Sequence, residues 1–356
     1  MDLNEINDVI SDETSDLGET SDLGGLSGGL NEKRILVRVI RELSAEMGIE
    51  AEFLSEDWII CLRKKGPNGK DQLHYIYGYE WGLNSAAAQL IAKDKAAAYE
   101  VLALNNIKAV EHKLFFNYFI QKNYTGQDGC WEEISRYVQL HRKNDDYNLI
   151  CKPNRGTGGD DVYRIKNQLE LERIVQLMFS KYRDFCLCPF YEIEREYRVI
   201  FLKGQALLIY LKERPSVSGN GRDSLLNLII NKYGEKGLAY LENLSGDLTA
   251  VLQKDEEKLI SWKHNLGAGA RALIIEEGEI KSELAVLAGR AAGALGINFA
   301  SVDIALTGGE YHIMEINSGM MMESFARQPR DSKYNYYEIC KDIYRRALNC
   351  LFNEGS

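Results

Sequence analysis

Patterns of apolar residues typical of helices and of strands follow one another in an irregular order along most of this 356-residue chain. This irregular order restricts the possible folds more than any other feature of the sequence. Residues 33–48 carry apolar side chains at three- and four-residue intervals, which predicts a helix that ends at Gly48. Residues 196–211 and 301–316 each read as two strands joined by a tight turn that contains glycine. Because helices and strands mix without a strict strand–helix–strand repeat, the sequence predicts an α+β protein built around antiparallel sheets.

The remaining elements follow from the same patterns. Further strands are predicted at residues 53–63, 73–79, 114–119, 147–153, 162–165 and 272–275. Helices are predicted at residues 83–104 (Ala-rich), 131–141, 169–182, 282–295 and 337–351, with two more between residues 225 and 258.

The acidity of the chain is concentrated at its N-terminus. Residues 1–32 contain nine acidic and no basic side chains, so the net charge of −10 leaves −1 for the remaining residues. This segment repeats Glu-Thr-Ser-Asp-Leu-Gly at residues 13–18 and 19–24, continues into a Gly/Ser run, and has no aromatic residue. Such a segment buries too little apolar surface to offset the entropy of ordering, so we expect a disordered tail with a flexible linker. The tail serves either as a solubilising leader or as a segment that binds a partner.

Composition excludes several classes of function. A nearly neutral body lacks the basic surface of a nucleic-acid-binding protein. No apolar run reaches the roughly 18 to 20 residues of a membrane span, and the N-terminus lacks the pattern of a signal peptide. The seven cysteines are odd in number and mostly scattered, which is typical of a reducing compartment. We therefore expect a cytoplasmic protein without a nucleic-acid or membrane partner.

A glycine-rich loop follows one of the predicted strands. Lys152 ends this strand, and the loop contains Gly156, Gly158 and Gly159. Glycines let backbone N–H groups approach phosphate oxygens, and the lysine adds a point charge. Alone, this pattern is more often an ordinary turn.

The last predicted hairpin carries three oxygen ligands. Asp303 lies on its first strand, and Glu315 and Asn317 lie on one face of the second because strand side chains alternate. Hard oxygen ligands that converge in this way suit Mg²⁺ bound to nucleotide phosphates. Capped or paired polar groups at a strand end are the alternative interpretation.

Together with other blocks in the same order, these motifs resemble the ATP-grasp superfamily of carboxylate–amine ligases over residues 83–330. The nearest resemblance is to the branch of glutathione synthetases, cyanophycin synthetases and ribosomal-protein glutamate ligases. The blocks are Lys93-Asp94-Lys95, Cys151-Lys152-Pro153, Cys188-Pro189-Phe190-Tyr191, Arg195-Glu196-Tyr197-Arg198, Arg214-Pro215 with Gly219-Asn220-Gly221-Arg222, His264-Asn265, Asp303 and Glu315-Ile316-Asn317.

The resemblance implies an ATP-grasp fold whose domains follow one another in a particular order along the chain. After the tail come an N-terminal α/β domain (residues 33–113), a central subdomain (residues 114–187) and a C-terminal subdomain with the magnesium site (residues 188–356).

The resemblance also implies roles for individual residues. ATP would contact Lys95, Lys152, the glycine loop (Gly156, Gly158, Gly159), the adenine-reading hinge (Pro189, Phe190, Tyr191) and the ribose-binding acid Glu196. Asp303, Glu315 and Asn317 would bind magnesium, as two ions, with Mn²⁺ as an alternative metal. The substrate carboxylate or the phosphates would be held by Arg198, Arg222, Asn265 and Arg271.

The implied activity is ATP-dependent formation of an amide bond through an acyl phosphate, with release of ADP and phosphate. Substrates would be a carboxylate and an amine from amino acids or peptides, and such ligases are often oligomers. The loop at residues 214–223 has the composition of a closing lid. A phosphotransferase on the same scaffold and a non-catalytic nucleotide-binding protein are the alternatives.

Three departures from the family pattern bear on the site. Asp160 and Asp161 follow the glycine loop and place negative charge near a polyanion unless both side chains turn outward. Ser301 replaces an arginine of D-alanine–D-alanine ligases, which argues against that substrate. Residues 320–322 are three methionines, which either line an adaptable pocket or, as we expect, fill the core.

Overall fold

The computed structural model describes residues 34–353, apart from residues 67–68, 118–119, 121–128, 143–145, 157–158, 242–243, 245 and 331–332. The expected acidic tail, residues 1–32, lies outside the described residues. The chain divides into two units, Met1–Arg34 and Ile35–Ser356, and the helices and strands below belong to the second. The predicted boundaries at residues 113 and 187 stay predictions.

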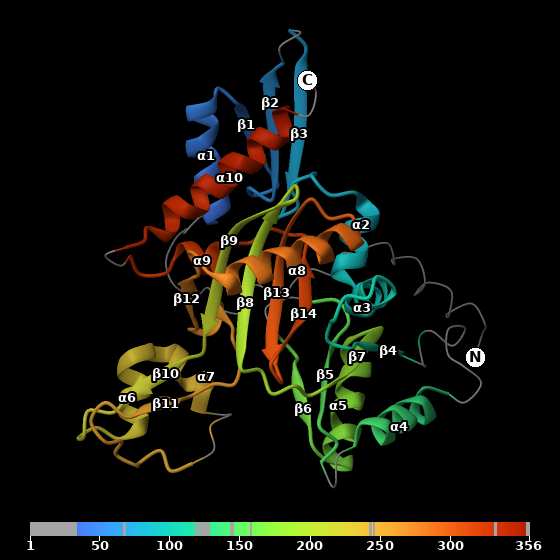
Figure 1. Ribbon diagram of the computed structural model, residues 1–356, viewed down its shortest axis with the longest axis vertical. Helices are drawn as coiled ribbons and strands as arrows, with labels where there is room; N and C mark the ends of the chain where they lie inside the picture. The colour runs from blue at the N-terminus through green and yellow to red at the C-terminus, as the bar shows by residue number, and fades with distance from the viewer. Residues whose placement is uncertain are drawn as a thin grey trace, which may run out of the picture. The chain divides into compact units, whose positions relative to one another are not determined.

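A five-stranded antiparallel sheet is the centre of this unit (Figure 1). Its strands lie in the order β12 (Arg271–Ile274), β9 (Gln205–Glu213), β8 (Arg195–Leu202), β13 (Phe299–Thr307) and β14 (Glu310–Asn317). Positive backbone φ angles at Lys203 and Gly204, and at Gly308 and Gly309, make the two tight turns. Both hairpins predicted from the sequence are confirmed.

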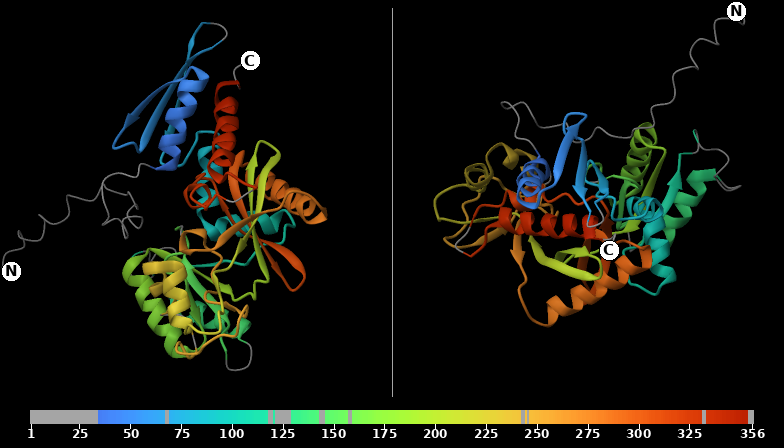
Figure 2. Two further views of the ribbon diagram at one scale, coloured as in Figure 1. Left: turned by 90° about the vertical axis from the view of Figure 1, so that its left-hand side faces the viewer. Right: turned by 90° about the horizontal axis from the view of Figure 1, so that it is seen from above.

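The two faces of this sheet pack against different helices, as Figure 2 shows. One face, which includes Val199, Ile209 and Val302, packs against the 17-residue helix α8 (Glu279–Leu295). Part of the other face packs against α9 (Glu323–Ala326) and α10 (Tyr336–Asn353), with the ring centroids of Tyr210 and Phe325 5.0 Å apart. The rest of that face carries polar side chains.

The predicted Ala-rich helix at residues 83–104 is two helices, α2 (Ala86–Lys93) and α3 (Lys95–Leu104). Asp94 separates them because its extended backbone ends α2 while its side chain accepts a hydrogen bond from the Ala97 N–H, at 3.0 Å. Lys95 thereby becomes the first residue of α3.

A second, four-stranded antiparallel sheet has the order β4 (Lys113–Phe116), β7 (Asp184–Pro189), β5 (Leu149–Pro153) and β6 (Tyr163–Ile165). Helices α4 (Gly129–His141) and α5 (Gln168–Lys181) share a core with one face, which includes Phe115, Cys151 and Leu187. Strand alternation places Ile150, Lys152, Cys186 and Cys188 on the other face.

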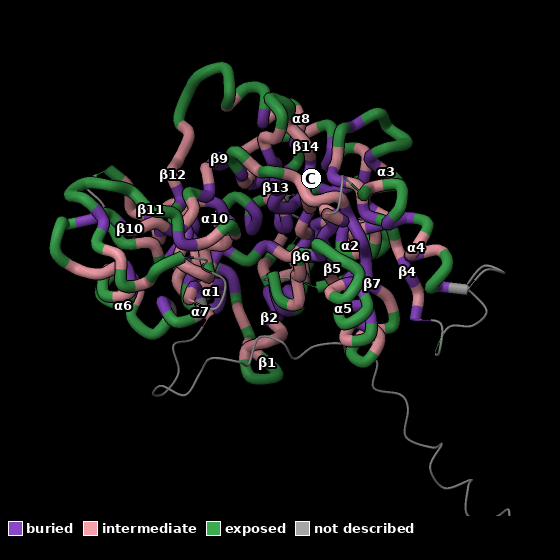
Figure 3. Tube along the Cα trace, turned by 90° about the horizontal axis from the view of Figure 1, so that it is seen from below, coloured by how far each residue is buried: buried purple, intermediate pink, exposed green. Residues whose placement is uncertain are grey.

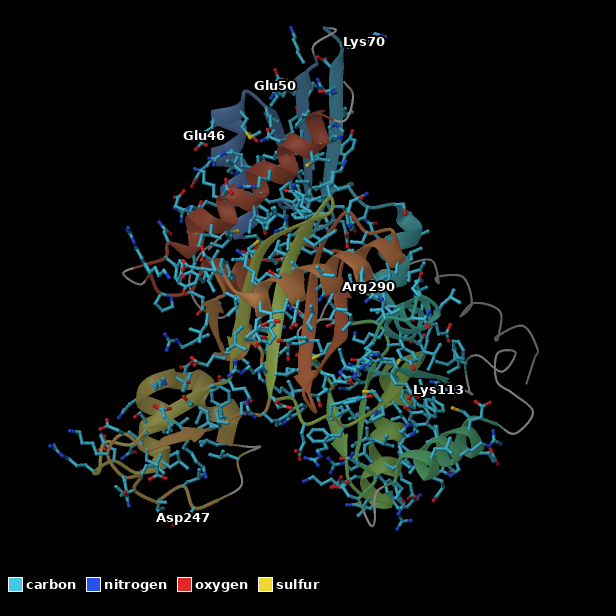
Figure 4. The ribbon with its side chains drawn as sticks, viewed as in Figure 1. Glu46, Glu50, Lys70, Lys113, Asp247 and Arg290 are labelled. Carbon is cyan, nitrogen blue, oxygen red and sulfur yellow. The ribbon has the colours of Figure 1, made fainter. Side chains whose placement is uncertain are left out.

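The N-terminal elements are α1 (Ile35–Met47) and a three-stranded sheet of β1 (Glu50–Leu54), β2 (Ile59–Lys65) and β3 (Asp71–Tyr77). The helix predicted from residue 33 is confirmed, but the single strand predicted at residues 53–63 is wrong. Ser55, Glu56 and Asp57 all have positive φ and turn the chain back between β1 and β2. Helix α10 packs on α1, where Lys341 donates to Glu46, labelled in Figure 4, at 2.7 Å.

Residues 214–264 include a small lobe with its own core around Val217, Ile229 and Tyr240. It contains β10 (Ser216–Ser218), α6 (Leu225–Tyr233), η2 (Gly234–Gly237), α7 (Leu238–Leu241) and β11 (Glu257–Leu259). Two helices were predicted here, but the pairing of β10 with β11 was not. The predicted lid loop, residues 214–223, contains β10, so part of it is fixed in this sheet. Figure 3 colours the exposed segments of the lobe green.

The seven cysteines are free thiols. Among the described residues, no helix combines the length and the apolar character of a membrane span.

Candidate active site

A row of polar side chains crosses the central sheet on the face opposite α8. The strand register places Tyr210, Arg198, Asp303 and Glu315 side by side on β9, β8, β13 and β14. The next row toward α9 contains Ser301 and Asn317. Directly opposed residues of antiparallel strands share a face, so the sheet brings together Asp303, Glu315 and Asn317.

Asp303 is at the centre of a buried ion-pair network. Arg198 donates to both carboxylate oxygens of Asp303 at 2.7 Å, and the ammonium of Lys212 lies 2.9 Å from the same carboxylate. Lys212 also donates to Glu196, at 2.5 Å. Burial alone raises the pKa of Asp303, but Arg198 and Lys212 outweigh it, so the pKa lies below its ordinary value. The two positive and two negative charges of this network cancel.

Lys95 joins the two sheets at one point. Its ammonium donates to the main-chain carbonyl of Gly156, in the glycine loop after β5, at 2.8 Å. It also lies 3.3 Å from the carboxylate of Glu315 on β14, and only 9% of the Lys95 side chain is exposed. The first residue of α3 therefore contacts both the predicted phosphate loop and a predicted metal ligand.

Asn154, which the sequence did not single out, fixes Lys95 in this place. Its main-chain carbonyl accepts from the Lys95 N–H at 3.2 Å, and its side-chain oxygen accepts from the Ala96 N–H at 3.1 Å. The thiol of Cys186 donates to the same oxygen at 3.1 Å. Asn154 is fully buried and ties the start of α3 to the end of β5, two residues after Lys152.

Lys152 faces the site without a partner. Within the described part of the chain its ammonium makes no hydrogen bond or ion pair, and the residue is half-buried. A small apolar cluster lies beside it on the same face, formed by Val110, Ile150, Val162, Cys188, Phe190, Tyr191 and Met314. An apolar cluster beside a lysine with no described partner combines an apolar surface that suits a flat ring with a charge that suits an anion.

Two residues of the predicted hinge (Pro189, Phe190, Tyr191) belong to this cluster, Phe190 and Tyr191. The Phe190 N–H donates to the Asn148 carbonyl at 2.7 Å, and the Phe190 carbonyl accepts from the Asn148 side chain at 3.4 Å. Both main-chain polar groups of Phe190 are therefore already hydrogen-bonded to Asn148.

The glycine loop touches the segment that leaves the small lobe. Lys263 donates to the Gly159 carbonyl at 3.2 Å. A Cβ atom on Gly159, which has a φ of +80°, would lie 3.7 Å from the amide nitrogen of Asn265. The structure thus brings Gly156, Gly159 and Asn265 together, whereas Gly158 lies outside the described residues.

Asp161 is turned away from the loop into a separate cluster. Its carboxylate accepts from Tyr163 at 2.6 Å, from Tyr182 at 2.5 Å and from Lys181 at 3.0 Å. Burial raises the pKa of Asp161, but these three donors outweigh it and the pKa is lowered. The negative charge that follows the glycine loop is therefore partly neutralised by α5; Asp160 is exposed.

Two predicted site residues lie apart from this row. Arg222 is exposed in the turn between β10 and α6. Arg271 is exposed on the edge strand β12 and lies 3.8 Å from Glu213. Of the three methionines, Met320 and Met322 are in the core, and Met321 is 42% exposed.

The oxygen atoms at the polar row are of the chemical type that binds a divalent cation. Asp303, Glu315 and Asn317 offer hard oxygen ligands from one face of a hairpin, the type that Mg²⁺ prefers. Both carboxylates already have a cationic group beside them, Arg198 and Lys95. No three His, Cys, Asp or Glu side chains among the described residues are arranged as a metal site, and the third oxygen of this set comes from the amide of Asn317.

Comparison with known proteins identifies the fold. No model of a protein family and no curated protein matches the sequence. A bifunctional glutathione synthetase from Pasteurella multocida superposes with a TM-score of 0.53 and 16% identity, over 88% of this chain and 44% of that one. The chain has the ATP-grasp fold. The predicted α+β class is confirmed.

Other ATP-grasp structures superpose less closely. A D-alanine–D-alanine ligase from Bacillus anthracis is 16% identical over 76% of this chain and 72% of that one, with a TM-score of 0.46. The ATP-grasp ligase PsnB in complex with a minimal precursor is 16% identical over 74% and 63%, with a TM-score of 0.40. The chain spans less than half the length of the glutathione synthetase, and at these identities the ATP-grasp likeness concerns the fold alone.

Besides Asn154, sequence reasoning missed two further residues of the candidate site. Lys212 follows the apolar residues of β9 and is followed by Glu213, so in the sequence it reads as the polar end of a strand. His112 is buried beside Lys95 and has no distinguishing motif around it. Both positions become visible only when strands far apart in the sequence pair.

Proposed function

We propose that this protein is an ATP-dependent carboxylate–amine ligase that forms an amide bond and releases ADP and phosphate. The observation that carries the proposal is the position of Lys95. One buried ammonium contacts the glycine loop of the four-stranded sheet and an acid of the central sheet, as a residue that binds phosphates between two sheets would. The ATP-grasp fold supports the same assignment.

The nucleotide would lie between the two sheets. The apolar cluster of Phe190, Tyr191 and Met314 would take the adenine, with the hinge main chain beside it. Glu196, near the start of β8 and two residues before Arg198, would accept from the ribose hydroxyls while it keeps its ion pair with Lys212. Lys95 and Lys152 would bind the phosphates.

Phosphoryl transfer requires charge neutralisation and alignment more than covalent participation by the protein. The protein charges of Arg198, Lys212, Glu196 and Asp303 cancel, so excess positive charge has to come from Lys152 and from a bound cation. Asp303, Glu315 and Asn317 would hold Mg²⁺, which would offset the charge that develops on the phosphate oxygens.

A carboxylate has no good leaving group, so it has to be activated before an amine can form an amide with it. A carboxylate oxygen of the substrate attacks the γ-phosphorus, the bond from that phosphorus to the bridging oxygen breaks, and ADP leaves with the electron pair. The amine then attacks the acyl carbon and loses a proton, and the carbon–oxygen bond breaks to release phosphate. Arg198 would bind the carboxylate through the N–H groups that Asp303 does not use. The proximity of Lys263 and Asn265 to the glycine loop would help to exclude water.

The proposal is tested by a screen for ADP release over amino acids and short peptides, singly and in pairs, with mass spectrometry of the products. We expect ADP and a condensed product that is lighter than its two precursors by one water. A stable phosphorylated product without an amide would instead identify a phosphotransferase on this fold. Nucleotide binding without turnover over the whole panel would favour a non-catalytic protein.

A further inference from the structure

His112 lies near Lys95 and Lys152, the two lysines proposed to bind phosphates. It precedes β4, and the β4–β7 register places it opposite Cys188, on the face that carries Ile150, Cys186 and Lys152. This face is the one that contacts the proposed nucleotide, opposite the α4 and α5 core. His112 also lines a small cavity with Lys95, Tyr99 and Glu315.

One ring nitrogen of His112 is fixed by the backbone. Nδ1 lies 2.8 Å from the main-chain carbonyl of Val110, and a carbonyl only accepts, so Nδ1 carries the hydrogen. Burial, together with the charges of Lys152 and Lys95, lowers the pKa of His112 well below its ordinary value of 6.5, so the ring is neutral. Nε2 therefore presents a lone pair and can only accept.

The accepting nitrogen has no partner in the described part of the chain. Nε2 is buried, the residue is only 5% exposed, and no described donor bonds to it. An unsatisfied buried acceptor costs free energy and is rare in folded proteins. The ammonium groups of Lys152 and Lys95 are both close enough to lower the pKa of this ring. Of these two lysines, Lys152 is the one that has no hydrogen bond or ion pair among the described residues.

We propose that His112 is a positioning residue that accepts a hydrogen bond at Nε2 from the ammonium of Lys152 and so aims this lysine at the nucleotide phosphates. The inference rests on the proposed function. A neutral acceptor suits this place, because an acid would cancel the charge that Lys152 offers to a phosphate and an apolar residue would leave the ammonium free to rotate. Lys95 needs no such partner, since Gly156 and Glu315 already hold it.

The test separates the two nitrogens of the ring. In His112→Asn the amide nitrogen takes the place of Nδ1 and keeps the bond to Val110, but nothing replaces Nε2. In His112→Gln the amide oxygen reaches the place of Nε2, but the bond to Val110 is lost. Binding of the non-hydrolysable analogue AMP-PNP to the full chain is measured by calorimetry, with thermal unfolding measured in parallel. The partly buried His74, on β3 in the N-terminal sheet, provides matched controls, His74→Asn and His74→Gln.

We expect His112→Asn to bind AMP-PNP about tenfold more weakly than the wild type, the size of a lost hydrogen bond to a charged group, and His112→Gln to bind within about threefold. Both His74 variants should bind like the wild type. A residue that only supports the backbone gives the reverse order, with His112→Asn near normal and His112→Gln impaired, and that result overturns the proposal.

A second measurement does not depend on the folding of any His112 variant. In the wild-type chain with ¹⁵N-labelled histidine, the Nε2 resonance of His112 should shift toward that of a hydrogen-bonded acceptor when AMP-PNP is added. If AMP-PNP binds and this resonance does not move, His112 does not position Lys152. If the wild type does not bind AMP-PNP at all, it is the proposed function that fails.

Discussion

Arg198 donates two parallel hydrogen bonds of 2.7 Å to the carboxylate of Asp303, directly across the neighbouring strands β8 and β13. Paired hydrogen bonds between a guanidinium and a carboxylate are among the strongest polar contacts in proteins. Asp303 is 4% exposed, so its charge depends on Arg198 and Lys212 for compensation. A residue expected to bind a metal is therefore also part of the folded core, and substitutions at the site must be chosen with that in mind.

Asp303→Asn should destabilise the protein by about 3 kcal/mol, because it leaves Arg198 and Lys212 with too little negative charge in a buried place. Arg198→Ala should cost a similar amount. Urea unfolding measures both, and Arg271→Ala is the matched control, since Arg271 is 68% exposed and should change stability by less than about 0.5 kcal/mol. Equal stability of the Asp303→Asn protein and the wild type would show that the buried pair does not hold the sheet.

Glu315→Gln is the cleaner test of the proposed metal site. Glu315 is 28% exposed and its ion pair with Lys95 is long, at 3.3 Å, so the free energy of unfolding should change by less than about 1 kcal/mol. Substrate-dependent ADP release should fall at least about a hundredfold if a charged oxygen ligand is lost. Glu310→Gln, an exposed acid at the start of the same strand that pairs with Lys108, serves as the control. Full activity of the Glu315→Gln protein would remove Glu315 from the metal site.

Two glycine substitutions should have opposite effects. A Cβ atom on Gly219 would lie 2.0 Å from the Gln253 carbonyl oxygen, so Gly219→Ala should destabilise the small lobe by about 1 to 3 kcal/mol. A Cβ atom on Gly293, inside α8, meets nothing within 4 Å, so Gly293→Ala should stabilise that helix by up to about 1 kcal/mol. Thermal unfolding and protease resistance report both; a stable Gly219→Ala protein would mean that residues 252–253 move easily.

Stability should fall as the pH is lowered from about 7 to 5. Burial lowers the pKa of His264, and burial with Lys152 and Lys95 lowers that of His112, from an ordinary value of 6.5. Below pH 6.5 the unfolded chain binds protons at both positions and the folded chain does not, which favours unfolding. Each unit of pKa difference contributes about 1.4 kcal/mol. Urea unfolding at several pH values should show a flatter slope for His264→Gln than for the wild type; an unchanged slope would mean that His264 is protonated in the folded protein.

The sequence was most informative where a local pattern determines the structure. The hairpins at Lys203-Gly204 and Gly308-Gly309 could be predicted because such turns need positive φ, which glycine adopts at little cost. The break at Asp94 was missed, because alanines on both sides favour a helix and a single capping side chain decides the outcome. The three-residue strands β10 and β11 were missed for two reasons. They are too short to show an alternation of apolar and polar residues, and they pair although about forty residues separate them in the sequence.

The sequence predicted which types of residue form the candidate site, but it predicted less well which side chains contact one another there. The register brings Asp303, Glu315 and Asn317 to one face as the alternation of side chains implies. Nothing local reveals that Lys212 and Arg198 share Asp303, because those contacts join residues about a hundred positions apart. Arg222 and Arg271 have the same charge as Arg198, but Arg222 lies in an exposed turn and Arg271 on an exposed edge strand. Only the packing of the folded chain distinguishes these two arginines from Arg198.

The pairing of β8 with β13 has a consequence for how the chain folds. The β8–β9 hairpin can form early, because its strands are joined by two residues. Its partner strand arrives only after the small lobe and α8 have been passed, and closing such a long loop is slow. Until β13 docks, Arg198 and Lys212 lack Asp303, although Lys212 still has Glu196 on the same hairpin. Strand β8 then also has an open edge that another chain could pair with. The polar row that would perform the chemistry is thus among the last features to assemble. A chaperone that binds the partly folded chain would bind it before this row has formed.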